Sequence, residues 1–165
     1  MSESKQDRKL EESAREDLKT RGVNIDDIAE LVYFLQNPYV ENLTMAMCRE
    51  NVEGVLSKRE VQNAIITGIH LDRLAEKGDL DEPLRSILRT DESLYGIDEV
   101  VALSIVNVYG SIGFTNYGYV DKIKPGILKK LNDKSTGECH TFLDDIVGAI
   151  AAAASSRLAH GQAGE

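Results

Sequence analysis

Apolar residues recur every three or four positions along most of the chain, which is the spacing of one face of an α-helix. In the segment 3–20, Leu10, Ala14 and Leu18 stand on a charged background, so a surface helix with a thin apolar stripe is predicted there. No useful run alternates apolar and polar residues with a period of two, so strands are not required. The pattern therefore predicts an all-α fold.

Capping and helix-breaking residues divide the chain into further predicted helices. A side-chain oxygen at a helix start satisfies a free backbone N–H group, so Thr141 is expected to cap the last helix. Ser57 and Glu60 have the spacing of a capping box and are expected to open a helix. The predicted helices after the first are 24–37, 44–56, 57–78, 83–88, 97–109 with a continuation toward 122, a short helix from 125, and 141 onward.

The last predicted helix, HTFLDDIVGAIAAAASSRL over 140–158, consists largely of alanine, glycine and isoleucine. Such small side chains let a neighbouring helix approach closely. We therefore expect one multihelical bundle over residues 1–165, packed around this C-terminal helix, with 1–22 as a loosely packed N-terminal helix. The same small-residue face also suits a homodimer, so the oligomeric state stays open.

Composition narrows the class of protein. At 165 residues with 42% hydrophobic and 28% charged residues, the chain is typical of one soluble globular domain. The net charge of −9 argues against nucleic acid as a partner and against a polybasic grip on anionic lipid. Cys48 and Cys139 lie in no metal-ligand spacing and are expected to be free thiols. The charged N-terminus lacks the apolar core of a signal peptide, which indicates a cytoplasmic protein.

One uncharged run, Val100–Val120, has two interpretations. It is nominally long enough to cross a bilayer. Its serine, asparagine, tyrosine and glycine residues make it a poor lipid-facing helix. A buried core segment with a break near 110–113 is the favoured interpretation, and contact with a membrane surface is the alternative.

Acidic residues border the most apolar segments of the second half of the chain. They are Asp98 and Glu99, Asp121 with Lys124 three residues later, and Asp144 and Asp145. Buried carboxylates need cations or shared protons, because an uncompensated buried charge is costly. The alternative is that the two acidic pairs merely stabilise the positive ends of helix dipoles. Spacing alone does not show that these sites meet.

Three segments in order resemble the phosphatidylglycerophosphatase A family. They are GIDEVVAL at 96–103, YVDKIKPGIL at 119–128 and GECHTFLDDIVGAIAAA at 137–153, within the block 95–160. The family pattern has an acidic pair heading an apolar helix, then D-x-x-K-P, then a glycine-containing loop leading to a second acidic pair. The whole chain resembles a soluble branch of that family, the low-temperature-requirement proteins.

The resemblance implies an Mg²⁺-dependent phosphatase that removes the terminal phosphate of phosphatidylglycerol phosphate, a phosphorylated glycerolipid. The residues to which it assigns roles are Asp98, Glu99, Asp144 and Asp145 as metal ligands and Asp121 and Lys124 as catalytic residues. Carboxylate oxygens suit Mg²⁺, and Lys124 would serve as a point charge for the phosphate. His140, just before the second acidic pair, is our candidate proton donor to the leaving alkoxide. The nucleophile is either a metal-bound water or an aspartate that forms a phospho-enzyme.

The chain also departs from the family pattern. It has neither the early Gly-Thr-x-Gly-Ser stretch nor several membrane-spanning helices, and its first ninety residues are expected to be polar amphipathic helices. A peripheral contact with the inner face of the membrane would then give access to lipid. Two other functions stay open: a phosphatase of a soluble phosphorylated metabolite, and a non-catalytic helical protein that binds a cation.

Overall fold

The computed structural model describes residues 4–163, and in this range the chain is helical, with no strand. The helices are α1 (Lys5–Thr20), α2 (Ile25–Gln36), α3 (Met45–Leu56), α4 (Arg59–Lys77), α5 (Leu84–Thr90), α6 (Ile97–Val106), α7 (Ser111–Ile123), α8 (Ile127–Leu131) and α9 (Leu143–Ala163), with the 3₁₀ turns η1 (Asn107–Tyr109) and η2 (Lys134–Thr136). The prediction of an all-α fold is confirmed, and the helix predicted over 97–109 comprises α6 and η1.

Several predicted helix ends are confirmed by their hydrogen bonds. The Asn24 side chain accepts from the N–H of Asp27 at 2.9 Å, and together they form the capping box of α2. The Thr44 hydroxyl accepts from the N–H of Met47 at the start of α3. Gly78 ends α4 in the left-handed conformation with φ of 73°, which glycine adopts without steric cost.

Two predicted caps are wrong. Ser57 does not open α4, because it ends α3 in a helical conformation and its hydroxyl donates to the carbonyl oxygen of Gly54. An N-cap residue needs an extended backbone, and Lys58 takes that position without a side-chain bond. Thr141 does not cap α9, because its hydroxyl donates to the carbonyl oxygen of Leu88 at 2.6 Å.

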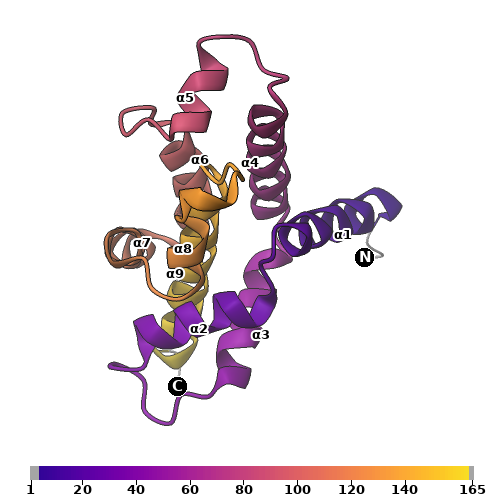
Figure 1. Ribbon diagram of the computed structural model, residues 1–165. Coiled ribbons are helices and arrows are strands. Elements are labelled where there is room, and N and C mark those ends of the chain that lie inside the picture. Colours follow the sequence, from indigo (N-terminus) through magenta and orange to yellow (C-terminus); the bar gives the residue numbers. More distant parts are fainter. Residues whose placement is uncertain (1–3, 164–165) are drawn as a thin grey trace.

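Helix α9 lies in the middle of the bundle and contacts α2, α3, α4, α6, α7 and α8 (Figure 1). Residues 141–156 are buried without exception. The packing is close: a Cβ atom added to Gly68 of α4 would lie 3.0 Å from the Cβ of Phe142. The expectation of a bundle packed around the small-residue C-terminal helix is confirmed.

Helix α1 extends away from the rest of the bundle and lies on α4 (Figure 1). Ala14 and Leu18 of its apolar stripe are buried. An ion pair between Asp17 and Arg73, 3.1 Å apart, joins the two helices.

The uncharged run 100–120 is divided between α6, η1 and α7. One side of it is core, with Ile105 and Val120 fully buried, whereas Val100 is 59% exposed and Tyr119 is 50% exposed. The expectation of a buried segment is therefore correct for one side and wrong for the other. Over residues 4–163, we find no helix whose length and apolar character would let it cross a membrane. Cys48 and Cys139 are buried free thiols, as predicted.

Candidate active site

The ends of three helices bring the acidic segments together. The first turn of α6 carries Asp98, the first turn of α9 carries Asp144 and Asp145, and α7 ends between Asp121 and Lys124. Both α6 and α7 pack on α9. The Nζ atom of Lys124 lies 3.1 Å from Oδ1 of Asp121 and 3.5 Å from Oδ2 of Asp144. Residues far apart in the sequence therefore form one charged cluster.

Three carboxylates of this cluster are almost fully buried. Asp98, Asp144 and Asp145 are 7–8% exposed, whereas Asp121 is half-buried and Glu99 is exposed. Each acidic pair is bonded to its own first helical turn: Asp144 accepts from the N–H of Asp145 at 2.8 Å, and Asp98 from the N–H of Glu99 at 3.0 Å. The N-terminal turns of α6 and α9 therefore both lie at this cluster.

Burial makes the ionised form of Asp145 unfavourable. Burial raises the pKa of Asp145 well above its ordinary value, and the charge of Asp144 and a hydrogen bond with Asp98 raise it further. Burial also raises the pKa of Asp144, although Lys124 pulls it down. Burial therefore opposes the ionised forms of Asp144 and Asp145, although both lie in the first turn of α9. A shared proton or a bound cation would offset this cost.

Lys124 stays charged in this setting. Burial lowers its pKa, but the carboxylates of Asp144 and Asp121 outweigh burial and hold the pKa above the ordinary value. An ammonium group on the rim of a carboxylate cluster is placed to bind an anion such as phosphate.

The hydroxyl of Tyr117 is buried in the same cluster without a hydrogen-bond partner in the described part of the chain. Burial raises its pKa, and so do the charges of Asp145, Asp121 and Glu99. A buried hydroxyl with no partner beside carboxylates has unused capacity for a ligand or a water molecule.

The carboxylates of the cluster fit a divalent cation such as Mg²⁺, which is bound through carboxylate oxygens and waters. Among residues 4–163, however, no three His, Cys, Asp or Glu side chains surround one point closely enough to hold a metal ion as they stand. Mg²⁺ usually keeps several waters and is bound through only one or two carboxylates, so the lack of three converging side chains is compatible with it.

His140 lies beside the cluster but both of its ring nitrogens are engaged. Nδ1 lies 2.9 Å from the carbonyl oxygen of Leu131, and Nε2 lies 2.8 Å from Oε2 of Glu138. When Glu138 is ionised both partners are acceptors, so the two bonds form together only if both ring nitrogens carry a proton. A protonated Glu138 would instead donate to Nε2. In this arrangement His140 ties the loop between α8 and α9, and its role as proton donor to a leaving group stays a prediction.

Asp72 of α4 is a buried acid beside the site that the sequence analysis did not single out. Its fully buried carboxylate accepts from the N–H of Phe142 at 3.0 Å and from the N–H of Leu143 at 3.0 Å. Asp72 therefore caps α9 from another helix, directly before Asp144 and Asp145. The available signal was its register, because Asp72 stands three residues after Ile69 on the inward face of α4.

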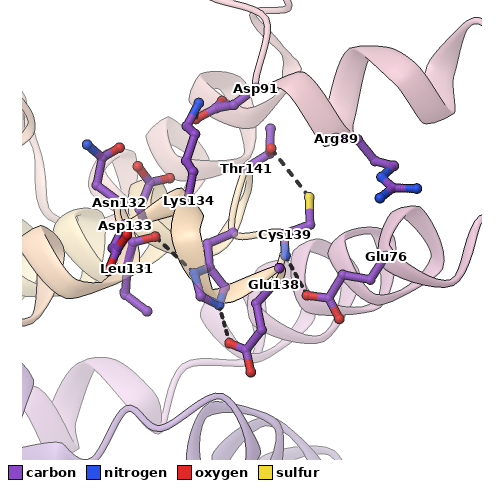
Figure 2. A pocket seen from close by; sticks show the side chains of 13 residues that line it. Glu76, Arg89, Asp91, Leu131, Asn132, Asp133, Lys134, Glu138, Cys139 and Thr141 are labelled. Carbon is purple, nitrogen blue, oxygen red and sulfur yellow. Dashed lines mark hydrogen bonds and ion pairs between the residues drawn. The ribbon is translucent and has the colours of Figure 1, made fainter.

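Asp144 also lines a cavity of about 180 Å³. Figure 2 shows this cavity from close by. Its wall comes from the end of α4, the segment 89–91 and the loop between α8 and α9. The lining residues are Glu76, Arg89, Asp91, Leu131, Asn132, Asp133, Lys134, Gly137, Glu138, Cys139, His140, Thr141 and Asp144. Ten of these thirteen residues have polar or charged side chains, so the cavity suits a small hydrophilic group.

Comparison with known proteins extends the resemblance to most of the chain. The model of the phosphatidylglycerophosphatase A family matches residues 18–160. The uncharacterized protein YutG of Bacillus subtilis (strain 168) is 69% identical over 160 residues, which cover 97% of this chain and 96% of that protein. The crystal structure of low temperature requirement C protein from Listeria monocytogenes is 67% identical, with a TM-score of 0.92 and coverage of 93% of this chain and 97% of that one. A protein of unknown function from Bacillus stearothermophilus is 73% identical, with a TM-score of 0.91 and coverage of 92% and 94%.

Proposed function

This chain belongs to the phosphatidylglycerophosphatase A family, and from that premise we propose that it is an Mg²⁺-dependent phosphatase that converts phosphatidylglycerol phosphate to phosphatidylglycerol and phosphate. Membership of the family implies phosphatase activity. The observation that carries the finer proposal is the buried carboxylate cluster of three helices with Lys124 on its rim.

Each residue of the cluster has a defined task in this proposal. Asp98, Asp144 and Asp145 are the buried carboxylates that would hold Mg²⁺, one or two of them as direct ligands, and the ion would supply positive charge for the phosphate. The ammonium group of Lys124 binds a phosphate oxygen and is oriented by Asp121. Asp121 is half-buried, so its carboxylate is accessible to accept a proton from an attacking water molecule or to attack phosphorus itself.

Phosphate release from phosphatidylglycerol phosphate in detergent, with Mg²⁺ and then with a chelator, tests the proposal. We expect release that depends on Mg²⁺. A parallel screen of water-soluble phosphomonoesters separates the alternatives: release from these and not from the lipid would indicate a metabolite phosphatase. Thermal stabilisation by Mg²⁺ without any turnover would indicate a non-catalytic cation-binding protein.

Exposed apolar side chains on the two helices that carry Asp98 and Asp121 support access to a lipid. They are Ile97 and Val100 on α6 and Phe114, Tyr119 and Ile123 on α7, which are 40–59% exposed. Some of them are sequence neighbours of Asp98, Glu99, Asp121 and Lys124. In our proposal this surface touches the membrane interface while the cluster reaches a headgroup.

Replacing Val100 and Ile123 together by Gln is expected to slow hydrolysis of substrate in bilayer vesicles by about tenfold, because each lost apolar side chain weakens interfacial binding. Hydrolysis of a soluble phosphomonoester should not change. Leu74→Gln, at an exposed position of α4, is the matched control. If the double variant alters the sedimentation coefficient instead, these side chains belong to a homodimer interface.

The metal-free protein is expected to lose stability as the pH rises from about 5 to about 8. Burial raises the pKa of Asp145, and it raises that of Asp72 to about 8. Such acids bind more protons in the folded than in the unfolded state above their ordinary pKa of 3.8, so the free energy of unfolding falls with rising pH. We expect the melting temperature to fall by about 5–10 °C.

Mg²⁺ should reverse much of this loss at the higher pH, because a bound cation replaces the protons. Differential scanning fluorimetry with and without Mg²⁺ at both pH values measures the effect. A melting temperature that is independent of pH and of Mg²⁺ would contradict the electrostatic description of the cluster.

A further inference from the structure

The acidic residues that line the cavity beside Asp144 are already satisfied. Apart from Asp144, which belongs to the carboxylate cluster, their partners are Arg21 for Glu76 at 2.6 Å, His140 for Glu138 at 2.8 Å, Lys134 for Asp91 at 3.7 Å and the N–H of Ser135 for Asp133 at 3.0 Å. These four carboxylates of the cavity therefore have little need of a further cation.

Arg89 is the charged lining residue without such a partner. In the part of the chain that the structure describes, its guanidinium makes no hydrogen bond and no ion pair, whereas Arg21 and Arg85 nearby are both paired. Figure 2 shows Arg89 on one side of the cavity and Lys134 on another, with Cys139 and Thr141 between them in this view. A free guanidinium with five donors is suited to a phosphate or carboxylate group.

Asp144 belongs both to the cavity and to the carboxylate cluster. A ligand whose reacting phosphate lies at the cluster would therefore extend its next few atoms into the cavity. At about 180 Å³ the cavity is smaller than the roughly 300–1,000 Å³ of pockets that bind drug-sized ligands. It has room for a short hydroxylated headgroup and not for acyl chains.

We propose that this cavity binds the non-reacting part of a phosphomonoester that carries a second anionic group, and that Arg89 recognises this second anion. The inference rests on the proposed function and deepens it. Arg89 is then a specificity-determining residue that binds substrate without touching the reacting phosphate.

Arg89→Ala tests this inference with two lipid phosphomonoesters in the same detergent. Phosphatidylglycerol phosphate carries a second phosphate as a phosphodiester, and phosphatidic acid does not. We expect kcat/KM for the first lipid to fall about 10- to 100-fold, chiefly through KM, because a charge-assisted bond is lost. The rate with phosphatidic acid should change less than about twofold. Arg89→Lys should recover part of the loss, and Lys129→Ala, at an exposed position of α8, is the control.

Binding of the deacylated diester glycerophosphoglycerol, measured by calorimetry, separates this inference from the proposed function. Weaker binding to Arg89→Ala than to the unchanged protein supports the inference even if no lipid is hydrolysed, in which case the proposed function fails alone. Two results for Arg89→Ala would overturn the inference: an equal fall of kcat/KM on both lipids, or no fall on either lipid together with unchanged binding of the diester. In both cases hydrolysis of phosphatidylglycerol phosphate by the unchanged protein would leave the proposed function intact.

Discussion

Asp145→Asn is expected to lower phosphate release from phosphatidylglycerol phosphate by about 100-fold or more while raising the melting temperature of the metal-free protein. The activity falls because an amide oxygen is a much weaker ligand for Mg²⁺ than a carboxylate. The stability rises because burial, Asp144 and Asp98 all disfavour the ionised form of Asp145 in the folded protein. An amide of the same shape removes that unfavourable charge.

Paired measurements of phosphate release and thermal unfolding at about pH 8 test this prediction, since the carboxylate is most disfavoured there. We expect an increase of a few degrees without Mg²⁺ and a smaller response to added Mg²⁺ than in the unchanged protein. Asp79→Asn is the matched control, because Asp79 is exposed, lies outside the cluster, and its change should move stability little. Full activity of Asp145→Asn, or of the double variant with Asp98→Asn, would remove Mg²⁺ binding by these acids from the mechanism.

Asp72→Ala is expected to destabilise the protein by about 2–4 kcal/mol, because it leaves the buried N–H groups of Phe142 and Leu143 without an acceptor. This corresponds to a fall in melting temperature of roughly 5–15 °C for a chain of this size. Activity should fall as well, since these N–H groups fix the first turn of α9, which presents Asp144 and Asp145.

The isosteric variant Asp72→Asn separates capping from charge. Its side-chain oxygen still accepts an N–H bond, so it should retain most of the stability that the alanine variant loses. Burial raises the pKa of Asp72 to about 8 even though the N–H groups of Phe142 and Leu143 lower it, so the asparagine should also reduce the dependence of stability on pH. Urea unfolding of both variants at about pH 6 and about pH 8 measures the two effects. Equal stability of the alanine and asparagine variants would show that Asp72 does not act as a cap.

Local sequence determined the helices because helix starts and stops depend on neighbouring residues. Asn24, Thr44 and Gly78 act within one turn of the backbone that they bond, so their positions could be predicted. The prediction for Ser57 failed for a local reason too. Ser57 lies between two helices, and it takes the helical conformation that ends α3 instead of the extended conformation that an N-cap of α4 needs.

The residues of the candidate site were also visible in the sequence, since acids beside apolar helices are unusual and three motifs in order resembled one family. The identity and order of these acids could therefore be read from the sequence. Their proximity in space could not, because the approach of α6 and α7 to α9 depends on packing that local patterns do not encode.

The amino-acid sequence by itself determined that this protein is helical, where most of its helices begin and end, and which acids border its most apolar helices. Only the tertiary structure decided that α9 is capped by Asp72 of α4, that Lys124 reaches Asp144, and that Arg89 faces a cavity beside them. The physical reason is range. Backbone hydrogen bonds within a helix join residues three or four apart, whereas the Asp72–Leu143 bond spans 71 residues and exists only after the bundle has packed.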